Sequence, residues 1–409
     1  MCSKAEPYNV PDRHTFPNAS ASFRDVSLAG QPSEALSFPE ATIRRAKMIT
    51  ALVHCPERLL SAEIDILLRV HEDGTLDMSA AYWPTHTLKT AIFGRVRKLV
   101  LLRKRSPALA PDDHPSAAGS EWEITPQKAA VKEMSWSKIM RKLDKSSCDA
   151  LREIKAMQYL MSPPCGSPPH HNVLSQIETL CDDDYLYSIM PYCSGGDLFD
   201  RVSQDERFTD PQARYWFRQL LQGLLHLQST GVSHRDLSLE NFLLDGKRGV
   251  IMDFDLAVRV PYSCPYDTGP VDHTHGSLRL LLPPMGSVGK WKYMAPEIKD
   301  NAGPFDGFAV DLWSVGVILF TMLAGIPPFQ FASLEDPLFR LISGGYLRVL
   351  VEEWKLNFSA EAIDLLQGMF KLRPKDRLTL QEVMEHPWVT NGEVMAPTTE
   401  DSGNEDWRN

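Results

Sequence analysis

The sequence predicts an α+β fold in which strands come first along the chain and helices dominate the second half. Extended, β-rich runs occupy residues 82–105, 128–134 and 184–190. Further along, the patterns become helical, with an amphipathic stretch at 211–229 and a largely apolar stretch at 312–329. Runs of strands followed by runs of helices are typical of the α+β class, and 409 residues with 43% hydrophobic content can bury a large core.

Composition excludes several classes of protein. The net charge of −10 disfavours nucleic acid as the main partner, because duplex binding usually needs a basic face. Seven cysteines are scattered and form no CxxC pair, so we expect reduced thiols rather than disulfides or a zinc site. The N-terminus lacks the apolar run of a secretory signal, and Gly and Pro interrupt the stretch at 312–329, so no membrane span is expected. We therefore expect an intracellular protein, cytoplasmic, with the nucleus as an open alternative.

The first 79 residues contain a tail and a short structured extension. Residues 1–40 are rich in Ser, Pro, Ala and Asn without a sustained period, which predicts a disordered tail. The extension at 41–79 has no assignable role. Its first part, 44–60, is compatible with a helix, whereas residues 63–80 predict two strands around the turn at Asp73–Gly74.

The elements that follow alternate between strand patterns and one helix. Residues 82–105 predict two strands with a turn near Gly94, and the Pro-, Ala- and Ser-rich segment 106–120 predicts a mobile loop. After the strand at 128–134, residues 149–161 are good helix formers. The strand at 184–190 then ends in a turn.

The second half is predicted to be mostly helical. Residues 211–229 place Trp and Leu side chains on one stripe, which indicates a core-facing helix, and Gly231 is a plausible stop. The stretch at 312–329 indicates a buried helix followed by a turn. The acidic segment 390–409 is predicted to be a flexible tail.

The stretch 232–255, VSHRDLSLENFLLDGKRGVIMDFD, follows the amphipathic helix and carries the chemistry. It combines the carboxylates of Asp236 and Asp253 with the amide oxygen of Asn241. Phosphoryl transfer needs a carboxylate to orient the attacking hydroxyl and hard oxygen ligands for a divalent metal ion. The pattern therefore points to phosphoryl transfer.

These residues resemble the catalytic loop and metal-binding segment of the eukaryotic protein kinase family, serine/threonine type. Four further motifs follow the family order: Ala130-Val131-Lys132, the helix carrying Glu153, Ala295-Pro296-Glu297 and an apolar helix beginning at Asp311. The HPWV ending at Val389 resembles the calcium/calmodulin-dependent branch. No EF-hand loop or calmodulin target follows it, so the resemblance gives no support for calcium control.

The resemblance implies a two-lobe kinase fold over residues 80–389. The small lobe, 80–190, would be β-rich with one main helix, and the large lobe, 194–389, would be mostly helical. The lobes would meet at the hinge near Met190 to Ser194.

The resemblance also implies roles for single residues. Asp236 would be the catalytic base, and Asn241 and Asp253 would hold Mg²⁺. Lys132 would contact the ATP phosphates and pair with Glu153. The remaining ATP contacts would come from Phe93, Gly94, Val96, Met190, Tyr192, Cys193 and Asp197, with Met190 as gatekeeper and Asp197 near the ribose. Of the glycines in the family's phosphate-binding loop only Gly94 is kept, so a plain strand turn is an equal alternative there.

Three positions depart from the family pattern. Asp255 replaces the glycine of the metal-binding DFG segment, giving DFD. Ser238 stands where such kinases place a lysine facing the γ-phosphate, and Lys290 stands where they have threonine. We hypothesise that the last two have exchanged roles, so that Lys290 supplies the cation. The alternative is that Lys290 is solvated or faces a peptide.

The activation segment, 253–297, is long at 45 residues. Its inserted stretch is rich in Pro and Gly, which predicts a disordered loop. The alternative is that SLRLLLPPM, which is too apolar for solvent alone, docks on the kinase or on a substrate. In the family, Arg235 couples activity to a charged group on this segment, and Glu297 would pair with Arg377. The possible phosphosites are Ser263, Thr268, Thr274, Ser277 and Ser287.

The sequence thus predicts a protein kinase that uses ATP and Mg²⁺ to phosphorylate Ser and Thr of protein substrates, as a monomer by default. One alternative is a pseudokinase that binds nucleotide or acts as a scaffold, favoured by the lost glycines, DFD and Ser238. A weaker one is tyrosine specificity.

Overall fold

The computed structural model describes residues 37–55, 60–105, 122–142, 150–162, 168–260, 271–272 and 279–397. The chain forms two compact units. Of the described residues, those within 40–143 and 177–190 form the first unit, and those within 37–39, 144–176 and 191–397 form the second. The first contains mainly strands and the second mainly helices, so the predicted α+β class is confirmed. Several predictions fall partly or wholly outside the described residues: the N-terminal tail, the loop at 106–120, the end of the C-terminal tail, and phosphosites Ser263, Thr268, Thr274 and Ser277.

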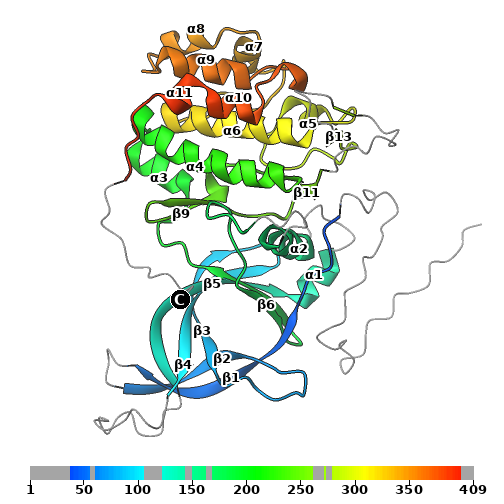
Figure 1. Cartoon of the computed structure of the whole chain (residues 1–409), viewed down its shortest axis with the longest axis vertical. Helices are drawn as coiled ribbons and strands as arrows, with labels where there is room; N and C mark the ends of the chain where they lie inside the picture. The colour runs from blue at the N-terminus through cyan, green and yellow to red at the C-terminus, as the bar shows by residue number, and fades with distance from the viewer. Residues whose placement is uncertain are drawn as a thin grey trace, which may run out of the picture. The chain divides into compact units, whose positions relative to one another are not determined.

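The first unit is built on a seven-stranded closed barrel, drawn in blue, cyan and green in Figure 1. Its strands follow the order β1-β2-β3-β4-β5-β7-β6, and β1 closes the barrel by pairing in parallel with β6. One short helix, α1 (Trp136–Lys142), follows β5. The strands are β1 (Arg44–Cys55), β2 (Leu60–Arg69), β3 (Ala80–Thr90), β4 (Gly94–Lys104), β5 (Trp122–Ser135), β6 (Glu178–Cys181) and β7 (Tyr185–Pro191).

The N-terminal extension supplies the two strands that close this barrel. The helix considered for residues 44–60 is wrong, because β1 pairs antiparallel with β2 from Ala46–Arg69 to Cys55–Leu60. The predicted turn at Asp73–Gly74 is confirmed: Gly74 has φ +83°, and Asp73 accepts the Thr75 N–H at 2.9 Å. A closed barrel leaves no unpaired edge, so tertiary pairing overrides the helix-forming composition of β1.

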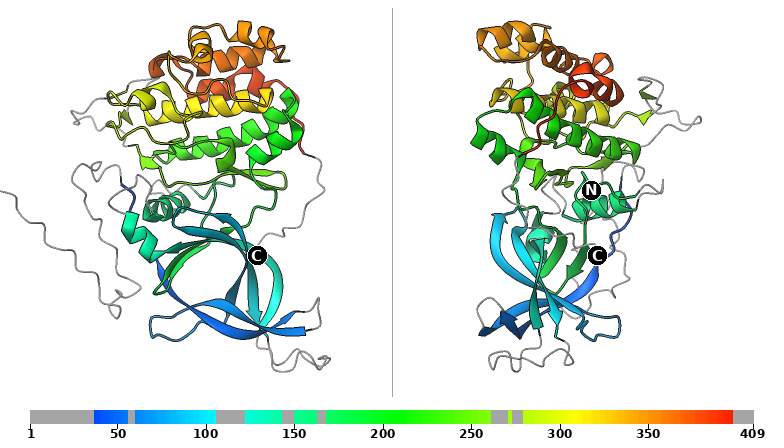
Figure 2. Two further views of the ribbon diagram at one scale, coloured as in Figure 1. Left: turned by 180° about the vertical axis from the view of Figure 1, so that it is seen from behind. Right: turned by 60° about the vertical axis from the view of Figure 1, so that its left-hand side comes forward.

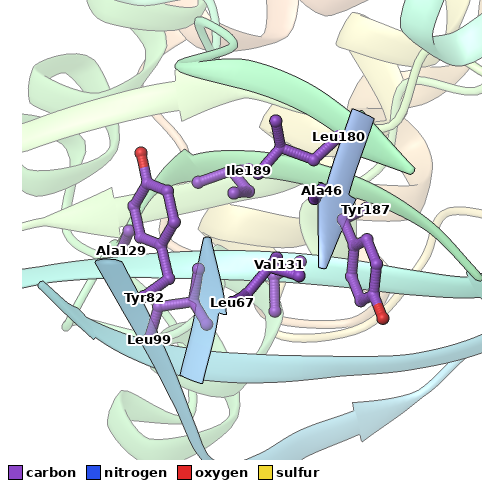
Figure 3. Packing of buried hydrophobic residues seen from close by; sticks show 9 residues of the cluster. All are labelled: Ala46, Leu67, Tyr82, Leu99, Ala129, Val131, Leu180, Tyr187 and Ile189. Carbon is purple, nitrogen blue, oxygen red and sulfur yellow. The ribbon is translucent and has the colours of Figure 1, made fainter. Parts of the chain in front are cut away.

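Buried side chains from all seven strands meet inside the barrel (Figure 3). The cluster consists of Ala46, Leu67, Tyr82, Leu99, Ala129, Val131, Leu180, Tyr187 and Ile189. Polar groups are satisfied beside it, since Glu178 accepts hydrogen bonds from Arg69 at 2.7 Å and from the Tyr82 hydroxyl at 2.5 Å. Burial raises the pKa of Tyr82, which stays a neutral donor. The extension is therefore part of the core of the first unit.

The second unit is mostly helical and includes short two-stranded sheets. Its helices are α2 (Ala150–Met161), α3 (Leu198–Asp205), α4 (Asp210–Ser229), α5 (Pro296–Asp300), α6 (Gly307–Ala324), α7 (Pro337–Ser343), α8 (Leu347–Glu353), α9 (Ala360–Met369), α10 (Leu380–Glu385) and α11 (Pro387–Thr390). Its strands are β8 (Val232–Ser233), β9 (Phe242–Asp245), β10 (Arg248–Ile251), β11 (Val258–Arg259), β12 (Val271–Asp272) and β13 (Arg279–Leu280).

Helices α4 and α6 lie side by side in the middle of this unit (Figures 1 and 2). Helix α4 begins with a capping box between Thr209 and Gln212, and Gly231 follows its end with φ +72°, so the predicted stop is confirmed. Helix α6 is long and apolar enough to cross a membrane, but 94% of it is buried inside the protein, as expected for a core helix. Residue Met395, within the predicted C-terminal tail, donates its N–H to Pro211 at 3.0 Å.

A stack of three histidines in the second unit makes stability depend on pH. The ring of His170 lies 4.6 Å from that of His171 and 5.4 Å from that of His226. Burial lowers the pKa of His170 from 6.5 to about 4, and electrostatic repulsion from His171 and His226 adds to this shift. As the pH falls, His170 therefore becomes protonated at a higher pH in the unfolded chain than in the folded protein. The contribution of neutral His170 to the free energy of unfolding is complete above pH 6.5 and is lost as the pH falls towards 4.

We expect His170→Asn to flatten the decline in unfolding free energy between pH 6.5 and 4, because asparagine has no proton to gain. The asparagine side chain can still accept the Asn172 N–H that the His170 ring now accepts at 3.2 Å. Urea unfolding at several pH values measures the effect. Equal slopes in the two proteins would contradict it.

Candidate active site

Hydrogen bonds to helix α6 fix the loop that carries the predicted base. Asp311, fully buried, accepts the backbone N–H groups of His234 and Arg235, each at 2.8 Å. Arg235 has φ +67°, a conformation that L-residues rarely adopt. These two charge-assisted hydrogen bonds stabilise that conformation and fix the direction in which the chain enters Asp236.

The carboxylate of Asp236 is oriented by two donors. Its Oδ1 accepts the backbone N–H of Lys290 at 3.0 Å, and its Oδ2 accepts the side-chain amide of Asn241 at 3.0 Å. Burial raises the pKa of Asp236, and the charge of Lys290 opposes that rise. A fixed, partly desolvated carboxylate is suited to accept a proton from a bound hydroxyl.

Two oxygens beside this carboxylate fit a divalent cation. The amide nitrogen of Asn241 is committed to Asp236, so its Oδ1 is left to accept or to bind metal. Oδ1 of Asp253 is buried and has no hydrogen-bond partner among the residues that the structure describes, and Asp253 has φ +70°. A buried carboxylate oxygen without a donor is costly unless a cation satisfies it. Mg²⁺ usually takes only one or two protein oxygens together with substrate phosphates, so this donor set fits Mg²⁺.

No group of three or more His, Cys, Asp or Glu side chains suited to a metal occurs in the part of the chain that the structure describes. The aspartate at position 255 does not adopt the backbone conformation that favours glycine: the described non-glycine residues with positive φ include Asp253 but not Asp255. Phe254 is fully buried against the ring of His234, 5.0 Å away.

The side chains of Lys290 and Ser238 meet. The ammonium of Lys290 donates to the Ser238 hydroxyl at 2.5 Å and lies 3.4 Å from Oδ1 of Asn241. A carboxylate oxygen of Glu240, which sequence reasoning did not single out, lies 3.5 Å from the same nitrogen. The structure therefore places a positive charge against the predicted base and metal ligand, although position 238 carries no cation.

Gly289 makes this approach possible. It has φ +95°, and a Cβ there would lie 2.9 Å from the carbonyl oxygen of Arg235 and 3.2 Å from Oδ1 of Asp236. Any other residue would push the activation segment away from the base. Gly289 and Asp311 had no predicted role in positioning the base, and their sequence signals are only a glycine before Lys290 and an aspartate in an apolar helix.

The guanidinium of Arg235 is buried without a full set of partners. Its Nε and Nη2 have no hydrogen-bond acceptor among the described residues, and its Cζ lies 5.6 Å from the ring of Phe305. Burial lowers the pKa of Arg235 to about 10. A buried cation with two free donors favours a nearby anion. Coupling of Arg235 to a phosphorylated residue stays a prediction.

From residue 279 on, the described part of the activation segment docks on the rest of the second unit, which is one of the predicted alternatives. Leu282 is fully buried, and its backbone exchanges hydrogen bonds of 2.8 and 2.9 Å with Phe305. Arg279, in β13, forms a buried two-bond ion pair with Asp306, with distances of 2.5 and 3.0 Å (β13 is labelled in Figure 1). The hydroxyl of Ser287, a predicted phosphosite, donates to the backbone of Ile298 and Lys299.

In the first unit, the predicted phosphate-binding loop is a tight turn. Ala91 and Gly94 exchange backbone hydrogen bonds of 3.0 and 3.2 Å, and the intervening Phe93 is buried. A Cβ on Gly94 would lie 1.9 Å from the carbonyl oxygen of Glu133, so strand packing alone requires this glycine. Val96 pairs with Lys132 across β4 and β5.

The other predicted nucleotide contacts are distributed over both units. Met190, in β7, is buried, and burial raises the pKa of the Cys193 thiol to about 12. Tyr192 lies between these two residues in the chain. Asp197 caps helix α3 by accepting the Asp200 N–H at 2.9 Å. Glu153 is buried in α2, which belongs to the second unit, whereas Lys132 belongs to the first, so their pairing stays a prediction.

The comparisons with known proteins agree with one another in the family that they indicate. The model of the protein kinase domain matches residues 123–389. Calcium-dependent protein kinase 24 of Arabidopsis thaliana is 32% identical over 66% of this chain and 41% of its own length. Serine/threonine-protein kinase SRK2F of Arabidopsis thaliana is 32% identical over 57% of this chain and 62% of its own length. Serine/threonine-protein kinase DCLK3 of Mus musculus is 31% identical over 61% of this chain and 29% of its own length.

The matched region spans between 29% and 62% of the length of these relatives. The match of the domain model begins in β5, so the tight turn at Gly94 and the two strands that close the barrel precede it.

Proposed function

This chain belongs to the protein kinase family, and we propose that it is an ATP- and magnesium-dependent kinase that phosphorylates Ser and Thr of protein substrates. The observation that carries the proposal is the fixed carboxylate of Asp236 beside two oxygens, of Asn241 and Asp253, that fit Mg²⁺. The names of SRK2F and DCLK3 support the serine/threonine class, and that of calcium-dependent protein kinase 24 supports a place in the calcium/calmodulin-dependent branch.

The chemistry follows from these positions. Asp236 accepts the proton of the substrate hydroxyl while the oxygen of that hydroxyl forms a bond to the γ-phosphorus of ATP. The bond from that phosphorus to the β–γ bridging oxygen breaks, and ADP leaves with the electron pair. Bound Mg²⁺ would neutralise charge on the phosphates, with Asn241 and Asp253 as its protein ligands. Asp311 and the Lys290 N–H keep the base and its loop in place throughout.

Transfer of labelled γ-phosphate to a generic protein mixture tests the proposal. We expect Mg²⁺-dependent labelling by the full chain, with label on phosphoserine and phosphothreonine after acid hydrolysis. Labelling on phosphotyrosine alone would overturn the serine/threonine assignment. Asp236→Asn is the control for a contaminating kinase, since labelling that it leaves unchanged does not come from this chain.

A second function, a pseudokinase scaffold, is supported by the tight turn at Gly94, which offers fewer open backbone N–H groups than a loop rich in glycine. It predicts that the chain binds nucleotide but labels no protein above the level of Asp236→Asn. Measuring ATP binding by calorimetry alongside transfer separates the two functions.

A further inference from the structure

We propose that Lys290, carried on the activation segment, supplies the cation that stabilises the transferring phosphoryl group. This inference rests on the proposed kinase function and names a catalytic residue for it. The ammonium lies 2.5 Å from the Ser238 hydroxyl and 3.4 Å from Oδ1 of Asn241, so it is next to the predicted metal ligand. Ser238 itself is buried and neutral.

The backbone of Lys290 is fixed independently of its side chain. Its N–H donates to Asp236 at 3.0 Å, and its carbonyl accepts the N–H groups of Tyr293 at 2.9 Å and Met294 at 3.1 Å. Gly289 permits the close approach to the base. A substitution that keeps the backbone thus removes the ammonium and leaves the orientation of Asp236 intact.

The segment on either side of Lys290 is also anchored to the second unit. Before it, Leu282 pairs with Phe305 and Arg279 with Asp306. After it, the carbonyl of Tyr293 accepts the Ser314 hydroxyl at 2.9 Å. Because both flanks are held, the backbone of Lys290 stays beside the base, within the reach of the side chain that the contacts with Ser238 and Asn241 show.

The contacts of the ammonium are ones that a phosphate can replace. The ammonium lies 3.5 Å from Oε2 of Glu240, and the two side chains are 36% and 30% exposed. That oxygen is buried, but it makes no hydrogen bond to the ammonium or to another of the described residues. The hydroxyl of Ser238 and the amide of Asn241 are neutral acceptors. A phosphoryl group with spreading negative charge would attract the lysine more strongly than these partners do, and most strongly in the transition state.

The test compares four proteins: wild type, Lys290→Thr, Ser238→Lys and the double variant. We expect Lys290→Thr to lower kcat about 100-fold with little change in KM for ATP, because the cation acts mainly in the transition state. The double variant returns a lysine from position 238 and a small hydroxyl at 290, and we expect it to regain at least tenfold. Ser238→Lys alone places two ammonium groups together and should be poorly active.

Lys292→Thr is the matched control, since Lys292 is an exposed lysine two residues along the same segment. We expect it to keep the wild-type kcat. Thermal unfolding of each variant checks that it folds. An unchanged kcat in Lys290→Thr overturns the proposal while leaving the kinase function standing, and so does a loss that the folded double variant fails to recover. A wild-type chain without transfer overturns both proposals.

Discussion

Replacing Asp236 by asparagine is expected to lower kcat by about 10²- to 10⁴-fold, the range for loss of a positioned general base. Asparagine cannot take up the hydroxyl proton. It also has one oxygen for two donors, so if that oxygen accepts the Lys290 N–H, its NH₂ group faces the amide nitrogen of Asn241 at about the present 3.0 Å. Two donors at that distance repel, and the metal ligand is displaced as well. Initial rates of phosphate transfer at saturating ATP measure the change.

Asp205→Asn provides the control for removal of a carboxylate. Asp205 ends α3 and pairs with Arg201 at 3.0 Å on the surface, where such pairs contribute little. It should leave kcat unchanged. A measurable fall of less than tenfold in Asp236→Asn would show that the base is elsewhere, whereas no fall at all would trace the activity to a contaminating kinase.

Arg377→Met is expected to lower the free energy of unfolding by about 3–5 kcal/mol, the range for breaking a buried ion pair. The guanidinium of Arg377 is fully buried, bonds both carboxylate oxygens of Glu297 at 3.0 and 3.2 Å, and donates to the carbonyl of Ala309 at 2.7 Å. It also lies 5.0 Å from the ring of Trp313. Methionine fills part of the volume but leaves the carboxylate of Glu297 without its cation. Urea unfolding followed by circular dichroism measures the change.

Two variants sharpen this result. Arg373→Met removes an arginine four residues earlier whose side chain is 69% exposed, and we expect a loss of less than about 1 kcal/mol. The double variant Arg377→Met, Glu297→Leu removes both charges and should recover much of the lost stability, because no unpaired carboxylate remains. Equal effects of Arg377→Met and Arg373→Met would contradict the assignment of a buried pair.

Local patterns sufficed where an element is stabilised by its own periodicity and caps. The apolar stripe of α4, including Trp216, Leu220 and Leu224, and the stop at Gly231 were predictable because they follow from helix geometry. The pair between Glu297 and Arg377 was predicted from the resemblance, and the structure contains it. The strand β1 was not predictable, because its Ala, Leu, Met and Lys residues favour helix, and only pairing with β2 and β6 makes it a strand.

By itself, the sequence determined the α+β class, the order of the motifs and the residue types needed for phosphoryl transfer, because these depend on composition and short-range spacing. Only the tertiary structure decided which groups meet. It places Asp311 against the loop of Asp236. It also contains the contact between the ammonium of Lys290 and Ser238, 52 residues earlier in the chain, on which the hypothesis of exchanged roles, made from the resemblance, depends. Contacts of that separation depend on how the activation segment packs and on the backbone freedom of Gly289, and neither is encoded in local periodicity.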